Sequence, residues 1–432
     1  MLRPLRQRDF RLLWTGMTVS MLGDGIYFVA IAWQVYDLSG SPSSLSLVGL
    51  AWSLGMVACL LLGGVASDRF DRRRVMIASD LVRGLAIAAI GVLAVAGAIE
   101  IWHLVVLSFA YGCAEAFFGP SFSALIPQIV PAEDLVQANS FQEVARPISY
   151  RLAGPAVGGV LVAAFGAGTA LLVDAGTFAV AVACVAALRT RPVPVGGPRP
   201  SVLADVREGL AYVRSQAWLW ATLVLACVSL LAFWGPVEVL LPYVIRNDLH
   251  RPATDFGLVL AASGLGGILG AVVMSRRGMP RHKVRFLYLA WGIGLLPIGG
   301  YALATQTWQL IVLAGLFGTG MSLGMVVWST LMQTRVPPAM LGRVTSLDWL
   351  VSIGLTPVSF ALTGPIAAAA GADATLIGAA VLGAAPALAL YVLVADLRRD
   401  EALHQPGEVL DEAGVADLRG LHAHDLDPVA GR

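Results

Sequence analysis

Charged residues are scarce in this chain. Asp, Glu, Lys and Arg make up only 13% of the 432 residues, whereas hydrophobic residues make up 57%. Soluble domains carry about 25% charged residues, so this composition excludes an ordinary soluble fold. The basic residues form no tract of the kind that binds nucleic acid, and a single lysine, Lys283, is present. We therefore expect a polytopic membrane protein with no nucleic-acid partner.

Several chemical motifs are also missing. The four cysteines stand in apolar runs, without the spacing of a disulfide framework or of a metal site. There is no Walker Lys–Ser pair, which argues against ATP as an energy source. No nucleophile–base pair or metal cluster indicates an enzyme. We expect no cofactor, no metal and no catalytic residue.

Long apolar runs occupy most of the chain. A bilayer core of about 30 Å needs about 20 apolar residues per helix. The first run follows several arginines and lacks a cleavage site, so it predicts a retained helix rather than a signal peptide. Twelve transmembrane helices of an all-α polytopic membrane protein are predicted near 12–36, 44–66, 75–97, 102–126, 142–166, 168–188, 218–244, 254–275, 284–304, 308–332, 344–369 and 374–395.

Arginines are distributed unequally between the loops. With helices that alternate in direction, one side of the membrane receives every strongly basic loop, and the other receives only Arg246 and Arg251. By the positive-inside rule the basic side is cytoplasmic, and both termini lie there. We expect a multi-pass protein of the plasma (inner) membrane.

The second half of the chain repeats part of the first. A pattern of six residues from Ser123 to Ser140 recurs from Ser329 to Ser346, at a constant offset of 329 − 123 = 206. The two copies follow the fourth and the tenth predicted helix. Such a duplication predicts two six-helix halves related by a pseudo-two-fold axis, with a substrate site between them near the midplane.

The repeat also sets the expected domain boundaries. Residues 1–188 form the N-terminal half and residues 216–398 the C-terminal half. Residues 189–215 begin as a Pro/Gly-rich linker and continue as an amphipathic stretch, which predicts an interfacial helix. The acidic tail, residues 399–432, is rich in polar and turn residues and is expected to be disordered on the cytoplasmic side.

Ionisable residues inside the predicted helices are candidates for function, because charge in hydrocarbon is costly. Asp24 stands in the middle of the first helix between Gly23 and Gly25, and these glycines permit another helix to approach closely. We predict that Asp24 binds and releases a proton. The alternative is a structural acid that is hydrogen-bonded to a neighbouring helix. Weaker candidates lie near the ends of their predicted helices: Asp174, Glu238 and Asp348.

A second candidate set lies on the fourth and fifth predicted helices. Glu115 is central in the fourth, and Arg151 is nine residues into the fifth. The two helices run in opposite directions, so both residues reach a similar depth. An unpaired arginine would be very costly there, and we expect Glu115 as its partner. The pair is either a static link between helices or a proton-switched contact, and the sequence leaves both open.

A short run of charged residues separates the second and third predicted helices. The pattern Gly-x-x-x-Asp-Arg-x-x-Arg-Arg begins at Gly64 and ends at Arg73. It resembles the signature loop between the second and third helices of the major facilitator superfamily of transporters, and the resemblance covers about residues 5–398. It implies that the chain has the fold of that superfamily.

The resemblance also implies roles for the loop. Gly64, Asp68 and Arg69 would belong to a conformational switch, because a carboxylate at this place can accept from the N-terminus of the eleventh helix. Arg72 and Arg73 would anchor the loop through ion pairs and lipid phosphates.

Two positions depart from the family pattern. Asp71 stands where the common motif has glycine, so we expect a different turn. Met274 stands where the duplicate copy would have its aspartate, so any latch formed by this loop is one-sided.

The fifth predicted helix carries a Gly-Pro-x-x-Gly-Gly pattern. Proline kinks a helix, and glycines permit tight packing. The alternative to a functional motif is an ordinary packing face of small residues. The full pattern resembles the motif that marks antiporters within the superfamily, and its residues are Gly154, Pro155, Gly158 and Gly159.

The segments around Asp24, the charged loop and the repeated pattern resemble one branch, which contains proton-driven multidrug, macrolide and enterobactin-type siderophore exporters. The prediction is a monomeric, proton-coupled antiporter in the lipid bilayer that exports amphipathic small molecules by alternating access. Alternatives are a proton-coupled importer of a small metabolite, a transport-dead sensor and a membrane enzyme. Aromatic residues expected to line an apolar cavity are Tyr27, Phe28, Tyr111, Phe118 and Trp328.

Overall fold

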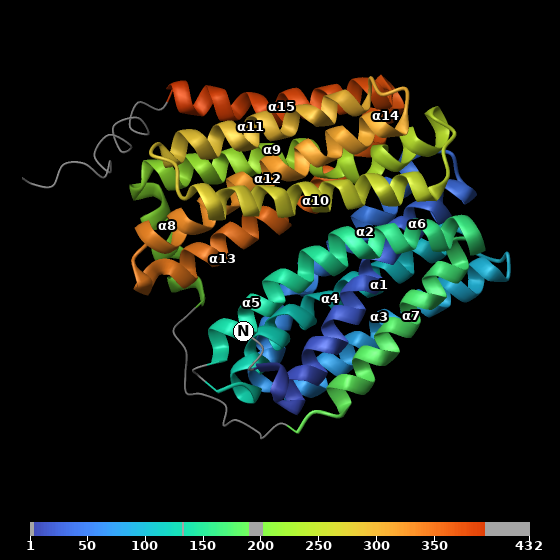
Figure 1. Cartoon of the computed structure of the whole chain (residues 1–432), viewed down its shortest axis with the longest axis horizontal. Coiled ribbons are helices and arrows are strands. Elements are labelled where there is room, and N and C mark those ends of the chain that lie inside the picture. Colours follow the sequence, from blue (N-terminus) through green and yellow to red (C-terminus); the bar gives the residue numbers. More distant parts are fainter. Residues whose placement is uncertain (1–3, 132–133, 190–201, 394–432) are drawn as a thin grey trace, which may run out of the picture.

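The computed structural model describes residues 4–131, 134–189 and 202–393, and α-helices dominate all three ranges. The tail and residues 190–201 of the predicted linker lie outside the described residues. Two bundles of helices are arranged side by side (Figure 1). The first contains α1 (Arg8–Leu38), α2 (Pro42–Arg69), α3 (Arg72–Val95), α4 (Ile101–Ile129), α5 (Leu135–Arg146), η3 (Pro147–Ala153), α6 (Gly154–Phe165) and α7 (Ala167–Ala186), after a short turn η1 (Pro4–Arg6).

The second bundle follows α8 (Val202–Ser215), which forms a helix where the amphipathic stretch was predicted and packs against the second bundle. Its elements are α9 (Ala217–Tyr243), η4 (Val244–Asp248), α10 (Ala253–Arg277), α11 (Lys283–Tyr301), α12 (Thr307–Arg335), α13 (Pro338–Gly354), α14 (Thr356–Ala370) and α15 (Ala372–Leu393).

Eleven helical segments in the described ranges are long and apolar enough to cross a membrane. This confirms an all-α polytopic architecture. Three of these segments are composite, because η3 continues into α6, α9 into η4 and α13 into α14. The twelfth predicted span corresponds to α15, whose apolar stretch Ala372–Ala387 is shorter than the others, so the count of twelve stays a prediction.

Equivalent helices pack in equivalent ways in the two bundles. The pairs α2–α4 and α10–α12 both make long contacts. A glycine holds each pair together: a Cβ atom on Gly112 would lie 2.0 Å from the Trp52 carbonyl oxygen, and one on Gly318 would lie 2.0 Å from the Ser263 carbonyl oxygen. The two glycines are separated by 318 − 112 = 206 residues, the offset of the sequence repeat. Backbone contact at this point is therefore common to both halves.

The two bundles meet at the end of the molecule opposite α8 (Figure 1). There α6 packs on α10, and α2 packs on α14. A Cβ atom on Gly159 would lie 2.7 Å from the Ala253 carbonyl oxygen, and one on Gly364 would lie 2.8 Å from Ser43 Cα. Both contacts cross from one half to the other, so glycines permit the bundles to close on each other at this end.

An ion pair fastens the same end. Arg246 in η4 pairs with Asp37 at the end of α1, and its Nη1 donates to the Trp33 carbonyl oxygen at 3.0 Å. Its guanidinium also lies 5.2 Å from the centre of the Trp33 ring. The Tyr36 hydroxyl donates to the Val239 carbonyl oxygen at 2.7 Å. One of the two basic residues predicted on the outer side thus links the two halves.

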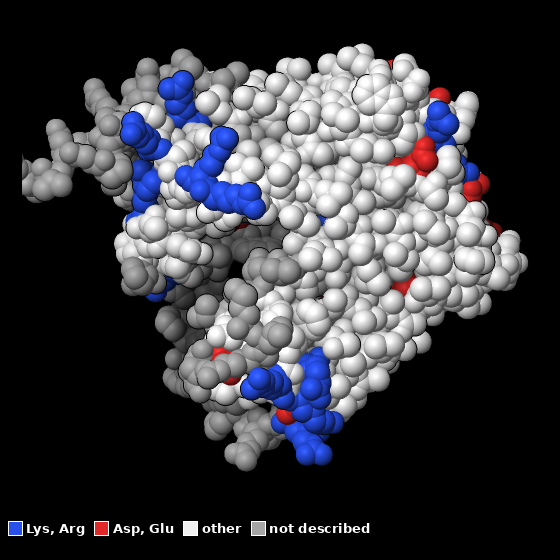
Figure 2. Space-filling view, in the orientation of Figure 1, with Lys and Arg blue, Asp and Glu red and all other residues white. Residues whose placement is uncertain are grey.

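The other end of the molecule is basic. In Figure 2, Lys and Arg side chains gather at the left and lower ends of the two bundles, and the broad surface to their right carries few charges. We call this the basic end; it carries α8 and the loop between α2 and α3. Between the bundles the surface is hollowed on this side (Figure 2).

The loop between α2 and α3 is held by backbone carbonyl groups. Arg72 Nη1 donates to the Ala124 carbonyl oxygen at 3.0 Å, and Arg73 Nε donates to the Val185 carbonyl oxygen at 3.0 Å. We expected ion pairs and lipid phosphates here. The last turn of α7 offers its carbonyl groups and the negative end of its dipole to the Arg73 guanidinium. The contact with lipid phosphates stays a prediction.

The remaining loop residues show why glycine is unnecessary in this turn. Asp71 caps α3, with φ −59°, and its carboxylate accepts from the Arg73 amide at 2.9 Å. Arg69 is exposed, and Gly64 has open space around it. The Asp68 side chain lies outside the described part, so its predicted contact with the eleventh span stays a prediction.

The close approach at Gly112 gives a first prediction. In Gly112→Ala the added methyl group meets backbone, and we expect the free energy of unfolding to fall by about 1–3 kcal/mol. Gly318→Ala should cost a similar amount. Gly119→Ala in the same helix α4, where a Cβ atom meets nothing within 4 Å, is the control and should not destabilise. Thermal unfolding of the purified protein measures all three; equal stability of the alanine variants at 112 and 119 would contradict the packing.

Candidate functional site

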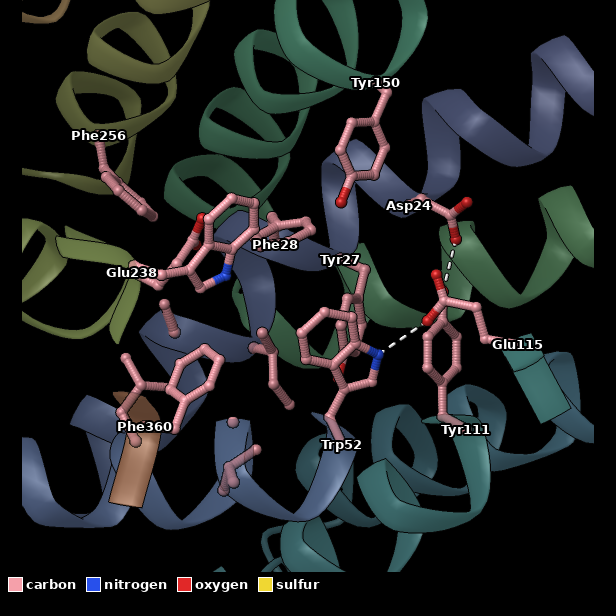
Figure 3. A pocket seen from close by; sticks show the side chains of 16 residues that line it. Asp24, Tyr27, Phe28, Trp52, Tyr111, Glu115, Tyr150, Glu238, Phe256 and Phe360 are labelled. Atoms are coloured by element: carbon pink, nitrogen blue, oxygen red, sulfur yellow. Dashed lines mark hydrogen bonds between the residues drawn. The ribbon is translucent and has the colours of Figure 1, made fainter. Parts of the chain in front are cut away.

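A cavity lies between the two bundles, with an empty volume of about 730 Å³ that includes space open to solvent. Both halves contribute to its wall (Figure 3). Eight of its sixteen lining residues are aromatic and three are acidic, and none of the sixteen is basic. The lining residues are Asp24, Tyr27, Phe28, Ile31, Ala32, Leu45, Val48, Gly49, Trp52, Tyr111, Glu115, Tyr150, Trp234, Glu238, Phe256 and Phe360.

Asp24 is positioned by the glycines on either side of it. A Cβ atom on Gly23 would lie 2.1 Å from Asp174 Oδ1 on α7, and one on Gly25 would lie 2.8 Å from the Tyr150 carbonyl oxygen on η3. Helix α1 therefore packs closely against α7 on one side and against η3 on the other. The Asp24 carboxyl group extends toward α4, where the Tyr111 hydroxyl donates to Oδ1 at 2.7 Å (Figure 3). The predicted role of the flanking glycines agrees with this geometry.

Glu115 is held by a hydrogen-bond donor on helix α2. The Trp52 indole Nε1 of α2 donates to Glu115 Oε2 at 2.8 Å (Figure 3). Tyr111 is one helical turn before Glu115 on α4, so both acids that face the cavity from the first bundle are tied to an aromatic donor. A donor of this kind stabilises a carboxyl group that has been removed from water.

Aromatic rings form the rest of the wall. Tyr27 stacks on Tyr111 with ring centroids 5.2 Å apart, and Phe28 meets Tyr150 edge-on at 5.5 Å. Trp52 of the first bundle and Phe360 of the second are 6.4 Å apart, in a T-shaped pair. The cavity thus has an apolar, aromatic lining that spans both halves.

The second bundle supplies the third acid. Glu238 on α9 lies on the opposite wall from Asp24 and Glu115, next to Phe256 (Figure 3). Its position near the end of the predicted seventh helix made it only a weak candidate. The structure places it on the cavity wall instead, where it is partly buried.

Arg151 does not pair with Glu115 in the described structure. Its side chain is exposed and lies within electrostatic reach of Glu238. The expected pair relied on depth alone, with a helical period of 3.6 residues. Residues 147–153 form a π-helical segment, which changes the direction of each side chain about the axis. The depth argument could not include this rotation.

Two of the aromatic residues expected in the cavity lie elsewhere. Phe118 stacks on Phe122 behind the wall, with ring centroids 5.6 Å apart. Trp328 on α12 is buried in the second bundle beside Trp218, and its indole nitrogen donates to Asp348 at 3.3 Å. Tyr27, Phe28 and Tyr111 do line the cavity, as predicted.

The Gly-Pro-x-x-Gly-Gly motif has two packing faces. Gly154 and Gly158 face α1: their Cβ atoms would lie 2.7 Å from Gly25 Cα and 2.9 Å from Ile26 Cα. Gly159 faces α10 of the other bundle, and the Pro155 carbonyl oxygen approaches Gly257 on the same helix. The motif therefore joins the Asp24 helix to the contact between the two halves.

Sequence reasoning missed two charged residues close behind the cavity, Asp80 and Arg83, and gave a third, Asp174, only as a weak candidate. Asp80 and Arg83 form a buried ion pair on α3, and Asp174 is fully buried on α7. An acid and an arginine three residues apart inside an apolar run share one helix face, and this spacing was the available signal. Asp174 gave no comparable signal, because its burial depends on the contact with Gly23.

The comparison with known families identifies the superfamily of the chain. The model of a family described as "Transmembrane secretion effector", within the major facilitator superfamily, matches residues 1–417. The chain belongs to the major facilitator superfamily. It is accordingly a membrane transporter and not an enzyme.

Curated members of the superfamily resemble the chain over most of its length. A multidrug efflux pump, Tap, of Mycolicibacterium fortuitum is 31% identical over 396 residues, which are 87% of this chain and 92% of that protein. Macrolide efflux protein A of Streptococcus pyogenes is 24% identical, with 82% and 88% of the two chains covered.

Solved structures of superfamily transporters share the fold. The nucleoside transporter NupG superposes with a TM-score of 0.67 at 11% identity, over 88% of this chain and 99% of that one. A bacterial homologue of the lysosomal transporter Spinster gives a TM-score of 0.68 at 14% identity, over 91% and 98% of the chains. These likenesses concern the fold alone.

The Tyr111–Asp24 bond gives a second prediction. Tyr111→Phe removes the hydroxyl donor and leaves a buried carboxyl group without it, so the free energy of unfolding should fall by about 1–3 kcal/mol. The matched control is Tyr27→Phe, whose hydroxyl is 3.4 Å from the Ser108 hydroxyl and should cost less. In an Asp24→Asn background the Tyr111→Phe change should cost less than in the parent protein. A double-mutant cycle by thermal unfolding measures the coupling, and additive costs would argue against the bond.

Proposed function

We propose that the protein is a proton-coupled antiporter that exports amphipathic, positively charged small molecules. One observation carries the proposal: three acids face one aromatic cavity between two halves whose described residues pack on each other at the end opposite the basic one. The names of the curated relatives, a multidrug efflux pump and a macrolide efflux protein, support export.

The charge of the lining favours a cationic substrate. Asp24, Glu115 and Glu238 contribute negative charge, and no lining residue contributes a positive one. Aromatic faces attract cations through their quadrupole and also bury apolar surface. An apolar molecule with one basic group satisfies both features. A strongly polar metabolite would leave the aromatic wall without a partner.

Proton coupling follows from the same acids. A carboxyl group in a dry cavity is costly when charged, so it holds either a proton or a cation as its neutralising partner. In the proposed cycle the substrate cation binds when the protons have left, and protons from outside displace it. Each proton that moves inward down the membrane potential supplies about 2.3 kcal/mol per 100 mV.

The two ends of the molecule then alternate. In this structure the Asp37–Arg246 pair and the α6–α10 contact close the end opposite the basic one. Export requires this end to open and the basic end to close. We assign Asp68 and Arg69 to the latch of the basic end, following the superfamily signature, with Gly64 as part of that switch.

Orientation and assembly follow in the same way. The basic end faces the cytoplasm under the positive-inside rule, and the protein lies in the plasma membrane with both termini inside. One chain supplies both walls of the cavity, so the proposed transport unit is a monomer.

A proton-coupled importer of a small metabolite is the main rival. It would need a cavity with few apolar aromatic residues, because small metabolites are polar. The eight aromatic residues of the lining favour export of an amphipathic molecule over that rival.

The third prediction tests Asp24. In a host without its own drug pumps, the protein should lower ethidium accumulation, and a proton uncoupler should abolish the effect. Asp24→Asn cannot exchange a proton and should raise accumulation to the level of the empty host at equal expression. Asp9→Asn, at the partly exposed start of the same helix, is the control. Uncoupler-sensitive efflux by the Asp24→Asn variant would remove Asp24 from the coupling mechanism.

The fourth prediction tests the charge of the substrate. Glu238→Gln keeps the shape of the side chain and removes its charge from the wall of the second bundle. Efflux of the cation ethidium should fall more than efflux of the neutral drug chloramphenicol, measured as initial rates in the same cells. Equal loss for both drugs would mean that Glu238 does not select charge.

A further inference from the structure

We propose that the buried pair Asp80–Arg83, which lies behind the cavity, is a positioning element for the proton of Asp24. The net charge of the pair determines the pH at which Asp24 gains and loses its proton. The inference rests on the proposed function, because it assigns a regulator to the proposed proton site. Neither residue lines the cavity, so the pair acts without touching the substrate.

The pair is sealed from solvent. Asp80 is 1% exposed and Arg83 is 3% exposed, and both belong to α3, which packs between α4 and α7. Arg83 is the only basic side chain that is buried among the described residues. A buried guanidinium cannot lose its proton, so its charge is a fixed feature of this bundle.

Three aromatic rings surround the guanidinium of Arg83, and one of them also contacts Asp24. The guanidinium carbon is 4.6 Å from the Phe118 ring centre, 4.7 Å from that of Phe178 and 5.8 Å from that of Tyr111. Tyr111 is the residue whose hydroxyl donates to Asp24. One ring thus lies between the fixed cation and the proposed proton carrier. Phe118, which we predicted in the cavity lining, packs on the guanidinium of Arg83 instead.

Acidic groups outnumber basic groups around the guanidinium of Arg83. Four helices contribute one acid each: Asp24 on α1, Asp80 on α3, Glu115 on α4 and Asp174 on α7. One buried guanidinium compensates one carboxylate. The other ionisable neighbours are the hydroxyls of Tyr27, Tyr111, and Tyr150 on η3, and the exposed Arg146, which acts on Glu115 from farther away. The carboxyl groups therefore compete for the charge of Arg83.

The pair also has unused hydrogen-bonding capacity. Arg83 Nε and Asp80 Oδ2 are buried and have no partner within the described structure, and the same holds for Asp174 Oδ2. An unpaired buried donor is costly, so a purely static pair would be expected to satisfy it. A guanidinium with a spare donor can divide its charge between Asp80 and the carboxyl groups beyond Tyr111.

The consequence for Asp24 depends on Asp80. When Asp80 is ionised, the pair is neutral as a whole and acts on Asp24 only weakly. Without the charge of Asp80, the positive charge of Arg83 acts on Asp24 in full and favours its ionised form. Without Arg83, the negative charge of Asp80 favours the protonated form of Asp24. The two members of the pair should therefore shift the titration of Asp24 in opposite directions.

An infrared titration tests this without any substrate. The stretching band of protonated carboxyl groups is followed against pH in the purified full-length protein, and the band of Asp24 is assigned by the difference from the Asp24→Asn variant of each background. In Asp80→Asn the midpoint for Asp24 should move to lower pH by about one unit. In Arg83→Gln it should move to higher pH by a similar amount, and in the double variant Asp80→Asn/Arg83→Gln it should return close to the parent value.

A merely structural ion pair gives a different result. It predicts lower thermal stability for both single variants, with midpoints that stay unchanged or move in the same direction, and either outcome overturns the proposal. Arg83→Gln leaves an unpaired buried acid and can fail to fold. In that case Asp80→Asn and the double variant decide: the first must shift and the second must not.

The result is separable from the proposed function. If the titrations shift as expected while Asp24→Asn still exports ethidium in an uncoupler-sensitive way, the proton site of the proposed function fails and the charge control of Asp24 stands. If Asp24→Asn abolishes export and no midpoint shifts, the control by Asp80–Arg83 fails alone.

Discussion

A carboxylate that is removed from water must be protonated, paired with a cation or hydrogen-bonded, because its charge is otherwise too costly in a low-dielectric interior. This constraint organises the first bundle. Tyr111 donates to Asp24, Trp52 donates to Glu115, and Arg83 pairs with Asp80. These partners leave negative charge without compensation by a fixed cation. Protons or a bound cation must supply the rest, and both are mobile.

The proposed proton exchange also needs a cavity that opens to one side at a time, because simultaneous access from both sides would let protons leak. The fold provides this through contacts of different kinds. Within each bundle, Gly112 and Gly318 bring neighbouring helices into backbone contact. Between the bundles, the contacts involve the Gly159 face and the Asp37–Arg246 pair at one end. The α6–α10 and α2–α14 contacts also belong to this interface, and all of them must separate for the closed end to open.

Much of the fold and part of the site could be predicted from the sequence. Apolar runs and the 206-residue repeat predicted the helices and the two halves, and charge inside an apolar run revealed Asp24 and Glu115. Trp52 gave no signal, since a tryptophan in an apolar run is equally consistent with a lipid-facing position. Arg151 was assigned the wrong partner, because the π-helical turn at 147–153 breaks the period on which the prediction relied. Burial of Asp80, Arg83 and Asp174 depends on how α3 and α7 are rotated, which no single helix encodes.

Competition between a proton and a substrate cation for the same carboxyl groups is the central claim. It is tested most directly by proton release from the purified transporter when ethidium binds, measured with a pH indicator in weakly buffered solution. We predict release of protons on binding, in an amount that falls as the starting pH is raised and that is reduced when Asp24 is replaced by asparagine. Saturable ethidium binding with no proton release at any starting pH would contradict the account.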